Sequence, residues 1–126
     1  MIFIDRSVPR SIAEALQKVR GDVMWLEDVW LFRHDTPETQ WLPAVGLADW
    51  LAVSRDKKIR TRPAERQALN DARVGAFIFT QGGNPTKWEY STMLATRLDD
   101  MEEIFATTPR PFIYAIQKGG ALKKLV

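Results

Sequence analysis

The chain contains no cysteine and a single histidine. Without cysteine it can form neither a disulfide framework nor a metal site that uses thiolates. No run of apolar residues approaches the about 20 needed to cross a membrane, and the N-terminal residues MIFIDRSVPR lack a signal-peptide pattern. We therefore expect a cytoplasmic protein that does not act in a membrane.

The composition is typical of a soluble globular protein: 126 residues, of which 45% are hydrophobic and 27% are charged. This length is that of one ordinary domain. The charge is unevenly distributed, since residues 1–50 carry five Lys/Arg against eight Asp/Glu, whereas residues 51–126 carry thirteen against eight. An acidic half and a basic half can attract each other, or they can supply a cation site and a phosphate-binding surface.

Short apolar runs alternate with amphipathic segments, which predicts an α/β fold with a mostly parallel sheet and a C-terminal β-hairpin. Ser7 is a candidate N-cap of the first helix, and Val19 belongs to its apolar stripe. Thr36 is the candidate cap of the second helix. Strands are expected at residues 1–4, 22–28, 50–54 and 75–81, helices at 7–21, 35–46, 62–72 and 84–108, and the hairpin at 112–126.

Three carboxylates are placed where parallel strands end or where a helix begins. Asp5 closes the first strand, Asp56 follows the third, and Glu38 lies in the first turn of the second helix. Ligands of open parallel sheets collect beyond the carboxyl ends of the strands. If the two strands are neighbours, these carboxylates meet there, and hard cations such as Mg²⁺ or Mn²⁺ take such oxygen ligands.

The segment around Asp56 is otherwise basic, which suits binding to the phosphates of a nucleic-acid backbone. Ser54 could orient the Asp56 carboxylate through its hydroxyl. A purely structural interpretation stays open, in which Asp5 and Asp56 cap helices or pair with Arg6 and Lys57. The basic residues expected to contact RNA phosphates are Arg55, Lys57, Lys58, Arg60 and Arg62.

The stretches FIDRSVP, ETQWLPAVG and WLAVSRDKKIRTRPAE together resemble the PIN-like nucleases, in particular the VapC-like toxins of type II toxin–antitoxin pairs. The resemblance covers about residues 1–80. It implies that residues 1–126 form one PIN-like domain, a three-layer α/β sandwich that cleaves RNA with Mg²⁺ or Mn²⁺. It also implies an antitoxin protein as partner and suggests a homodimer.

The resemblance assigns the site residue by residue. Asp5, Glu38 and Asp56 match the metal-binding acids, although Glu38 stands where the subgroup usually has Asp. Asp35 is close enough in sequence to compete with Glu38. Glu65 is the candidate for a fourth acid, and whether one metal ion or two are bound stays open. Supporting roles are considered for Ser54, Asp35, Glu65 and Arg6.

Two other classes of function are compatible with acids at strand ends. A receiver domain or a haloacid-dehalogenase-type phosphatase also places Asp there, but the sequence has Ser7 where such a phosphatase has its second acid. A non-catalytic module would bind nucleic acid or protein without cleaving it. Trp30 and Trp88 border predicted loops and are the candidates for stacking on bases, whereas Trp25, Trp41 and Trp50 are expected in the core.

Overall fold

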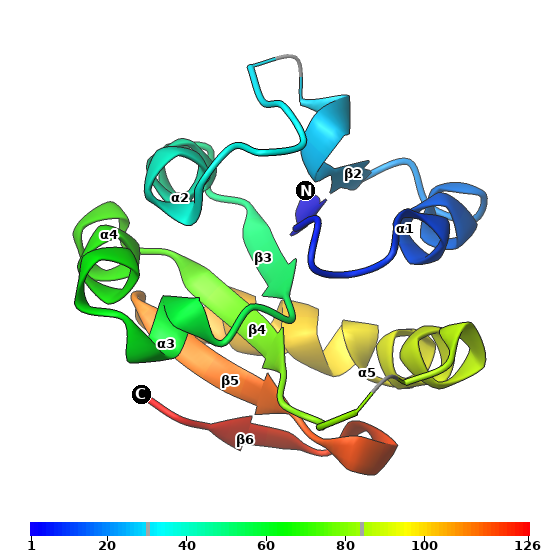
Figure 1. The fold of residues 1–126 in the computed structure, drawn as a ribbon. Helices are drawn as coiled ribbons and strands as arrows, with labels where there is room; N and C mark the ends of the chain where they lie inside the picture. The colour runs from blue at the N-terminus through cyan, green and yellow to red at the C-terminus, as the bar shows by residue number, and fades with distance from the viewer. Residues whose placement is uncertain (30, 84) are drawn as a thin grey trace.

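The fold is built on one sheet in the computed structural model, which describes residues 1–29, 31–83 and 85–126. The described strands lie in the order β2-β1-β3-β4-β5-β6, and all neighbours are parallel except β5 and β6. Figure 1 shows the twisted sheet running through the middle of the molecule. The strands are β1 (Ile2–Ile4), β2 (Val23–Trp25), β3 (Leu51–Ser54), β4 (Gly75–Phe79), β5 (Phe112–Ile116) and β6 (Leu122–Lys124).

Helices cover both faces of the sheet, as predicted for a three-layer α/β sandwich (Figure 1). One face carries α1 (Arg10–Gln17) and α5 (Lys87–Thr107). The other carries α2 (Glu38–Leu47), α3 (Lys58–Thr61) and α4 (Pro63–Ala72). Two short 3₁₀ helices, η1 (Leu26–Asp28) and η2 (Lys118–Gly120), follow β2 and β5. Among the described segments, no helix is both long and apolar enough to cross a membrane.

The core has two parts because successive side chains of a strand point to opposite faces of the sheet. In β1, Ile2 and Ile4 pack in the cluster under α1 and α5, while Phe3 packs under α2 against Trp41. The described core strands are therefore apolar at nearly every position, as is typical of a parallel sheet covered on both faces.

Two local features shape the C-terminal half of the chain, a helix cap and the predicted hairpin. Thr86 caps α5, since its Oγ1 accepts a hydrogen bond from the Glu89 backbone N–H at 3.1 Å and Glu89 accepts one from Thr86 N–H at 3.2 Å. The C-terminal hairpin turns through Gly119 and Gly120, whose φ angles of 82° and 91° favour glycine.

Three local predictions are wrong. Helix α1 begins at Arg10 and Pro9 occupies its N-cap position, so Ser7 does not cap it. Because α1 ends at Gln17, Val19 lies beyond the helix and is 78% exposed. Thr36 does not cap α2 either; its hydroxyl accepts a hydrogen bond from the Arg33 backbone N–H in the preceding turn.

The order of the strands reverses between β1 and β3. The chain leaves β1 toward β2 and then returns to β3 on the other side of β1. The segment after β1 leads to α1 on one face, and the segment after β3 leads to α3 and α4 on the other. At such a reversal the two connections diverge, leaving room for a ligand beyond the carboxyl ends of the strands.

Candidate metal centre

Three carboxylates from distant parts of the chain meet at this end of the sheet. One oxygen atom each of Asp5, Glu38 and Asp56 lies within 4.8 Å of the others, and this is the group of side chains able to hold a metal ion that the described residues bring together. Asp5 is completely buried, Glu38 is 3% exposed and Asp56 is partly buried. The structure therefore brings Asp5 and Asp56 together at one end of the sheet, as the sequence predicts.

The strands and helices around the three acids determine where each carboxylate lies. Asp5 directly follows β1, and its backbone N–H donates to Val53 O at 3.0 Å, which extends the pairing of β1 with β3 by one residue. Glu38 is the first residue of α2, after Pro37 at the N-cap position. The ring of Trp41, one turn further along α2, lies 4.9 Å from the ring of Phe3, which anchors the start of the helix over β1.

Two serine hydroxyls hold one oxygen of Asp5. Ser7 and Ser54 donate to Asp5 Oδ2 at 2.8 and 3.0 Å. The same hydroxyls accept backbone N–H groups of the next connection, Arg55 N to Ser7 at 2.8 Å and Asp56 N to Ser54 at 3.0 Å. Ser54 therefore orients the Asp5 carboxylate and the backbone at Asp56, rather than the Asp56 carboxylate as predicted.

Positive groups only partly compensate the three acids. Asp56 Oδ1 accepts the Lys58 backbone N–H at 3.0 Å, and Lys58 Nζ lies 3.6 Å from Asp56 Oδ2. Arg6 Nη2 lies 3.9 Å from Glu38 Oε1, and Arg6 also donates to the carbonyl of Thr36. No Lys or Arg among the described residues forms an ion pair with Asp5, the most deeply buried of the three.

Burial and mutual contact shift the pKa values of the two other carboxyls in opposite directions. Burial, a hydrogen bond to Asp56 and the charge of Asp56 raise the pKa of Glu38 to about 7. Burial also acts to raise the pKa of Asp56, but hydrogen bonds from Glu38 and Lys58 and the charge of Lys58 outweigh it, so the Asp56 pKa is lowered. Of the two carboxyls, Glu38 is therefore the one that takes up a proton as the pH falls toward neutrality.

These carboxylates fit a divalent cation. Asp5 Oδ1 and Glu38 Oε1 are buried and have no hydrogen-bond partner among the described residues, which is costly for groups withdrawn from water. A hard cation takes carboxylate oxygens as ligands and would compensate the charge that the protein leaves unpaired. The residues that could hold such an ion are Asp5, Glu38 and Asp56.

The sequence profile of the PIN-like domain family matches residues 1–81. The chain belongs to the PIN-like domain family. The match includes all three carboxylates, both serines and the first four strands of the sheet, and the family has a nuclease-type fold. No curated protein and no solved structure matches this PIN-like domain with significance.

Two acids considered for this PIN-like domain lie outside the cluster. Asp35 is exposed on the loop before α2, so Glu38 is the acid that the structure brings to Asp5 and Asp56. Glu65 lies half-buried in the first turn of α4 and is not part of the carboxylate group either. The partners named in the purely structural interpretation differ from those in the structure. Asp56 accepts the Lys58 N–H, but Lys57 holds the N-cap position of α3, and Asp56 pairs with Lys58 rather than with Lys57. Arg6 pairs with Glu38 rather than with Asp5.

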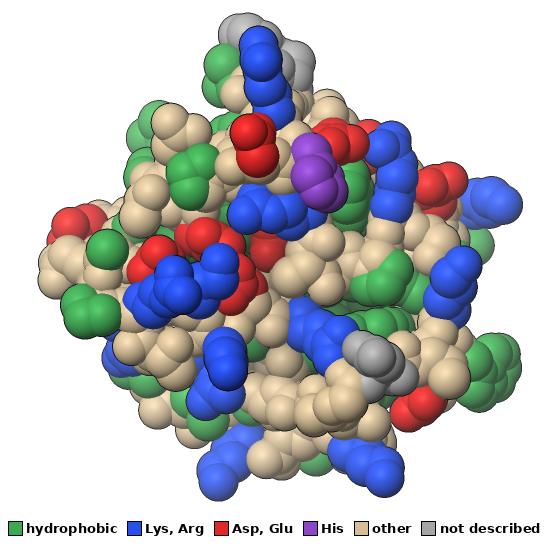
Figure 2. All heavy atoms as spheres, viewed as in Figure 1, with side chains coloured by type: hydrophobic (Ala, Val, Ile, Leu, Met, Phe, Trp, Pro, Cys, Tyr) green, Lys and Arg blue, Asp and Glu red, His purple; other side chains and the backbone are tan. Residues whose placement is uncertain are grey.

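The basic residues after β3 divide into two kinds. Arg55 and Lys58 are engaged within the protein: Arg55 donates to the Gly83 carbonyl and lies 5.9 Å from the centre of the Tyr90 ring, and Lys58 pairs with Asp56. Lys57 and Arg62 are exposed, whereas Arg60 is half-buried. Figure 2 shows acidic and basic side chains lying close together on the face drawn, with neither sign dominating it.

Ser7 is the site residue that sequence reasoning assigned wrongly. Its position two residues after a strand-end acid and two before proline is typical of a helix cap, which conceals its contact with Asp5. The expected core tryptophans Trp25 and Trp41 are buried and Trp50 is half-buried, while Trp88 is 78% exposed. Trp30 and Asn84 lie outside the described residues.

Proposed function

We propose that this PIN-like domain is a Mg²⁺- or Mn²⁺-dependent endoribonuclease that hydrolyses RNA phosphodiester bonds. The observation that carries the proposal is the convergence of Asp5, Glu38 and Asp56, with two buried carboxylate oxygens that have no hydrogen-bond partner among the described residues. A nuclease-type fold and an acidic cluster at the carboxyl ends of its strands are what metal-assisted phosphodiester hydrolysis requires.

Each residue of the site has a distinct task in this proposal. Asp5, Glu38 and Asp56 hold the ion, and Ser7 and Ser54 keep the Asp5 carboxylate turned so that Oδ1 remains available. When bound, the ion supplies polarisation of the scissile phosphate and activation of water. The exposed Lys57 and Arg62, with Arg60, contact phosphates on either side of the scissile bond.

The restriction to RNA and the biological role rest on the resemblance to VapC-like toxins. In that role the protein arrests growth by cleaving RNA, is neutralised by an antitoxin protein, and acts as a homodimer. Expression that halts growth, relieved by co-expression of a small protein encoded next to it, would support this part of the proposal. Growth that is unaffected by an active nuclease would reject the toxin role and leave the nuclease in place.

The direct test is cleavage of single-stranded RNA by the purified protein. We expect cleavage with Mg²⁺ or Mn²⁺, none with EDTA, and none of single-stranded DNA of the same sequence. Asp5→Ala and Asp56→Ala should lose nearly all activity, whereas Asp35→Ala, which removes a nearby exposed acid outside the cluster, should retain it. Retained cleavage in Asp5→Ala would reject the proposal, and RNA binding without metal binding or cleavage would favour a non-catalytic module.

A further inference from the structure

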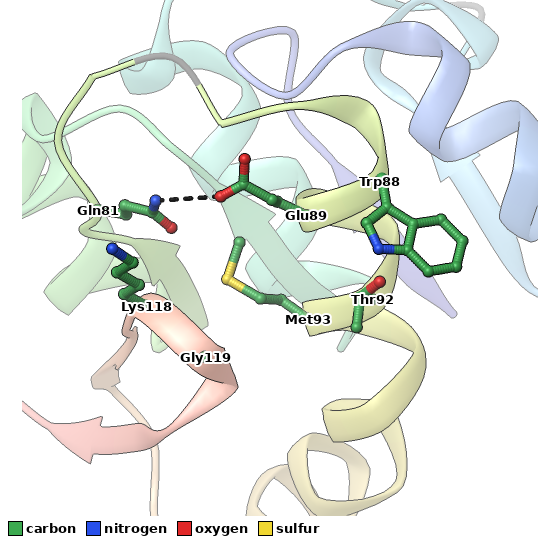
Figure 3. Close-up of a pocket in the computed structure, with 7 residues that line it drawn as sticks. All are labelled: Gln81, Trp88, Glu89, Thr92, Met93, Lys118 and Gly119. Atoms are coloured by element: carbon green, nitrogen blue, oxygen red, sulfur yellow. Dashed lines mark hydrogen bonds between the residues drawn. The ribbon is translucent and has the colours of Figure 1, made fainter.

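A pocket next to the acidic cluster has no role in the function proposed above. It has a volume of about 270 Å³ and lies where β4 and β5 end and α5 begins. Figure 3 shows Gln81 and Lys118, from the segments after β4 and β5, on one side and Glu89 and Met93 from α5 on the other. Met93 is 4% exposed and forms an apolar wall, while Trp88 stands on the rim and is 78% exposed.

The pocket and the acidic cluster share one edge of the sheet. Asp5 and Asp56 follow β1 and β3, and Gln81 and Lys118 follow β4 and β5, the next two strands in the sheet. With neighbouring strands about 4.8 Å apart, the two sites are separated by about 10 Å. Arg55 connects them, since it follows β3 and donates to the Gly83 carbonyl in the segment between β4 and α5.

The polar groups of the pocket include a donor and an acceptor that are available to a ligand. Gln81 Nε2 donates to Glu89 Oε2 at 3.4 Å, and because a carboxylate only accepts hydrogen bonds, this contact fixes the orientation of the amide. Gln81 Oε1 is then left buried without a partner among the described residues. Lys118 adds an exposed ammonium group at the same pocket. The pocket therefore offers an unpaired acceptor and a cationic donor at one end, while the Trp88 indole lies at the other end, beyond Glu89 and Met93 (Figure 3).

We propose that this pocket binds one unpaired base of the RNA strand whose scissile phosphate lies at the acidic cluster. This proposal rests on the proposed nuclease function and adds a subsite to it. The volume lies below the about 300–1,000 Å³ of pockets for drug-sized ligands, and so suits a single planar ring system. Proteins hold unpaired bases by stacking them on aromatic side chains and by hydrogen bonds to their edges, which Trp88, Gln81 and Lys118 supply.

The lining selects among the bases. Lys118 donates to a ring carbonyl, and Gln81 Oε1 accepts from a ring N–H group. Guanine and uracil carry a carbonyl next to a ring N–H, whereas adenine has no carbonyl and the unprotonated cytosine ring has no N–H. The subsite is therefore specific for guanine or uracil at one position beside the cleaved bond.

The test measures cleavage rates of single-stranded RNA oligonucleotides that carry each of the four bases in turn around one cleavage site, with Mn²⁺. The wild-type protein should prefer guanine or uracil at one position by about tenfold, the effect of one hydrogen bond to a charged group. Lys118→Met should abolish this preference and still cleave. Lys124→Met, which removes an exposed lysine of β6 outside the pocket, should keep it.

A binding measurement separates failure of the subsite from failure of the nuclease function. With EDTA present, fluorescently labelled RNA should bind Trp88→Ala about tenfold more weakly than wild type, through loss of stacking, while Leu47→Ala, another exposed apolar side chain, should bind normally. Unchanged base preference and unchanged binding in the Lys118 and Trp88 variants would overturn the subsite, and the pocket would then serve another ligand such as a peptide. Absence of any cleavage by the wild type, with binding still dependent on Trp88, would overturn the nuclease function and keep the base-binding site.

Discussion

Replacing Glu38 by glutamine should stabilise the metal-free protein and at the same time strongly reduce its stabilisation by metal. Glutamine has nearly the same shape and can donate to Asp56 as protonated Glu38 does, but it never ionises. The pKa of Glu38 lies at about 7 instead of 4.5, because burial and Asp56 disfavour its charge. Ionising Glu38 in the folded protein therefore costs about 3 kcal/mol of stability above pH 7, at 1.36 kcal/mol per pKa unit.

The direction in which stability changes with pH depends on whether the folded or the unfolded protein holds the proton of Glu38. The folded protein binds a proton at Glu38 that the unfolded chain has already released between pH 4.5 and 7. The contribution of Glu38 to stability is therefore fully present below pH 4.5 and is lost as the pH rises through 7. At pH 8 in EDTA, Glu38→Gln should unfold up to about 10 °C higher than wild type, at about 4 °C per kcal/mol for a chain of this size. At pH 5 the difference should shrink below about 1 kcal/mol.

The assay is thermal unfolding followed by circular dichroism at pH 5 and pH 8, with EDTA and with Mn²⁺. Mn²⁺ at about 100 times its dissociation constant should stabilise the wild type by about 2.7 kcal/mol, whereas Glu38→Gln should gain much less. Asp35→Asn is the matched control, because it removes an exposed acid outside the cluster and should behave as wild type. A Glu38→Gln protein that is less stable than wild type at pH 8 in EDTA, or equally stabilised by Mn²⁺, would refute the reasoning.

Three further sets of substitutions, each with a control, test other parts of the structure. Ser7→Ala removes a donor to Asp5 and the acceptor of Arg55 N–H, so metal affinity measured by calorimetry should fall about tenfold or more. The control Ser11→Ala removes a hydroxyl that has no partner among the described residues, and this variant should bind metal normally. Lys57→Ala and Arg62→Ala should each reduce the slope of log affinity for RNA against log salt concentration by about 0.7. The control Lys18→Ala, at the C-terminal end of α1, should leave this slope unchanged. Slopes equal to that of the wild type in the Lys57 and Arg62 variants would exclude their phosphate contacts. Gly46→Ala would place a Cβ against the Ala72 carbonyl oxygen and should lower the free energy of unfolding, measured with denaturant, by about 1–3 kcal/mol. The control Gly21→Ala adds a Cβ in open space and should change this free energy little.

The sequence predicts the sheet and the meeting of Asp5 with Asp56 because both depend on strong local signals. Apolar runs identify β1 and β3, and acids that directly follow parallel strands necessarily lie at one edge once those strands are neighbours. The position of Glu38 required in addition the resemblance to a family, since a glutamate in a helical first turn is common without any function.

Two other contacts between distant segments, the one between Ser7 and Asp5 and those that form the pocket, could not be predicted in this way. A serine before proline is an equally good candidate for a helix cap, and only the approach of residues 5–7 to residues 54–56 makes Ser7 a partner of Asp5. The pocket beside the cluster is formed by Gln81, Trp88 and Lys118, whose spacing in the chain carries no recognisable pattern. Both depend on the order of strands in the sheet, which local propensities do not encode.

The charges of the site explain why a carboxylate lies within a basic segment. The pKa of Asp56 is lowered beside Lys58 and that of Glu38 is raised to about 7, so in the metal-free protein Lys58, Arg6 and a proton taken up near neutral pH limit the repulsion of the three acids. A divalent cation at this site would displace that proton, which would couple metal binding to pH around neutrality. In the proposed nuclease, the exposed Lys57 and Arg62 would attract the phosphates of a strand whose backbone the acids alone would repel. That function would need an acid for the ion and bases for the substrate as neighbours, and the nine residues from Ser54 to Arg62 contain both.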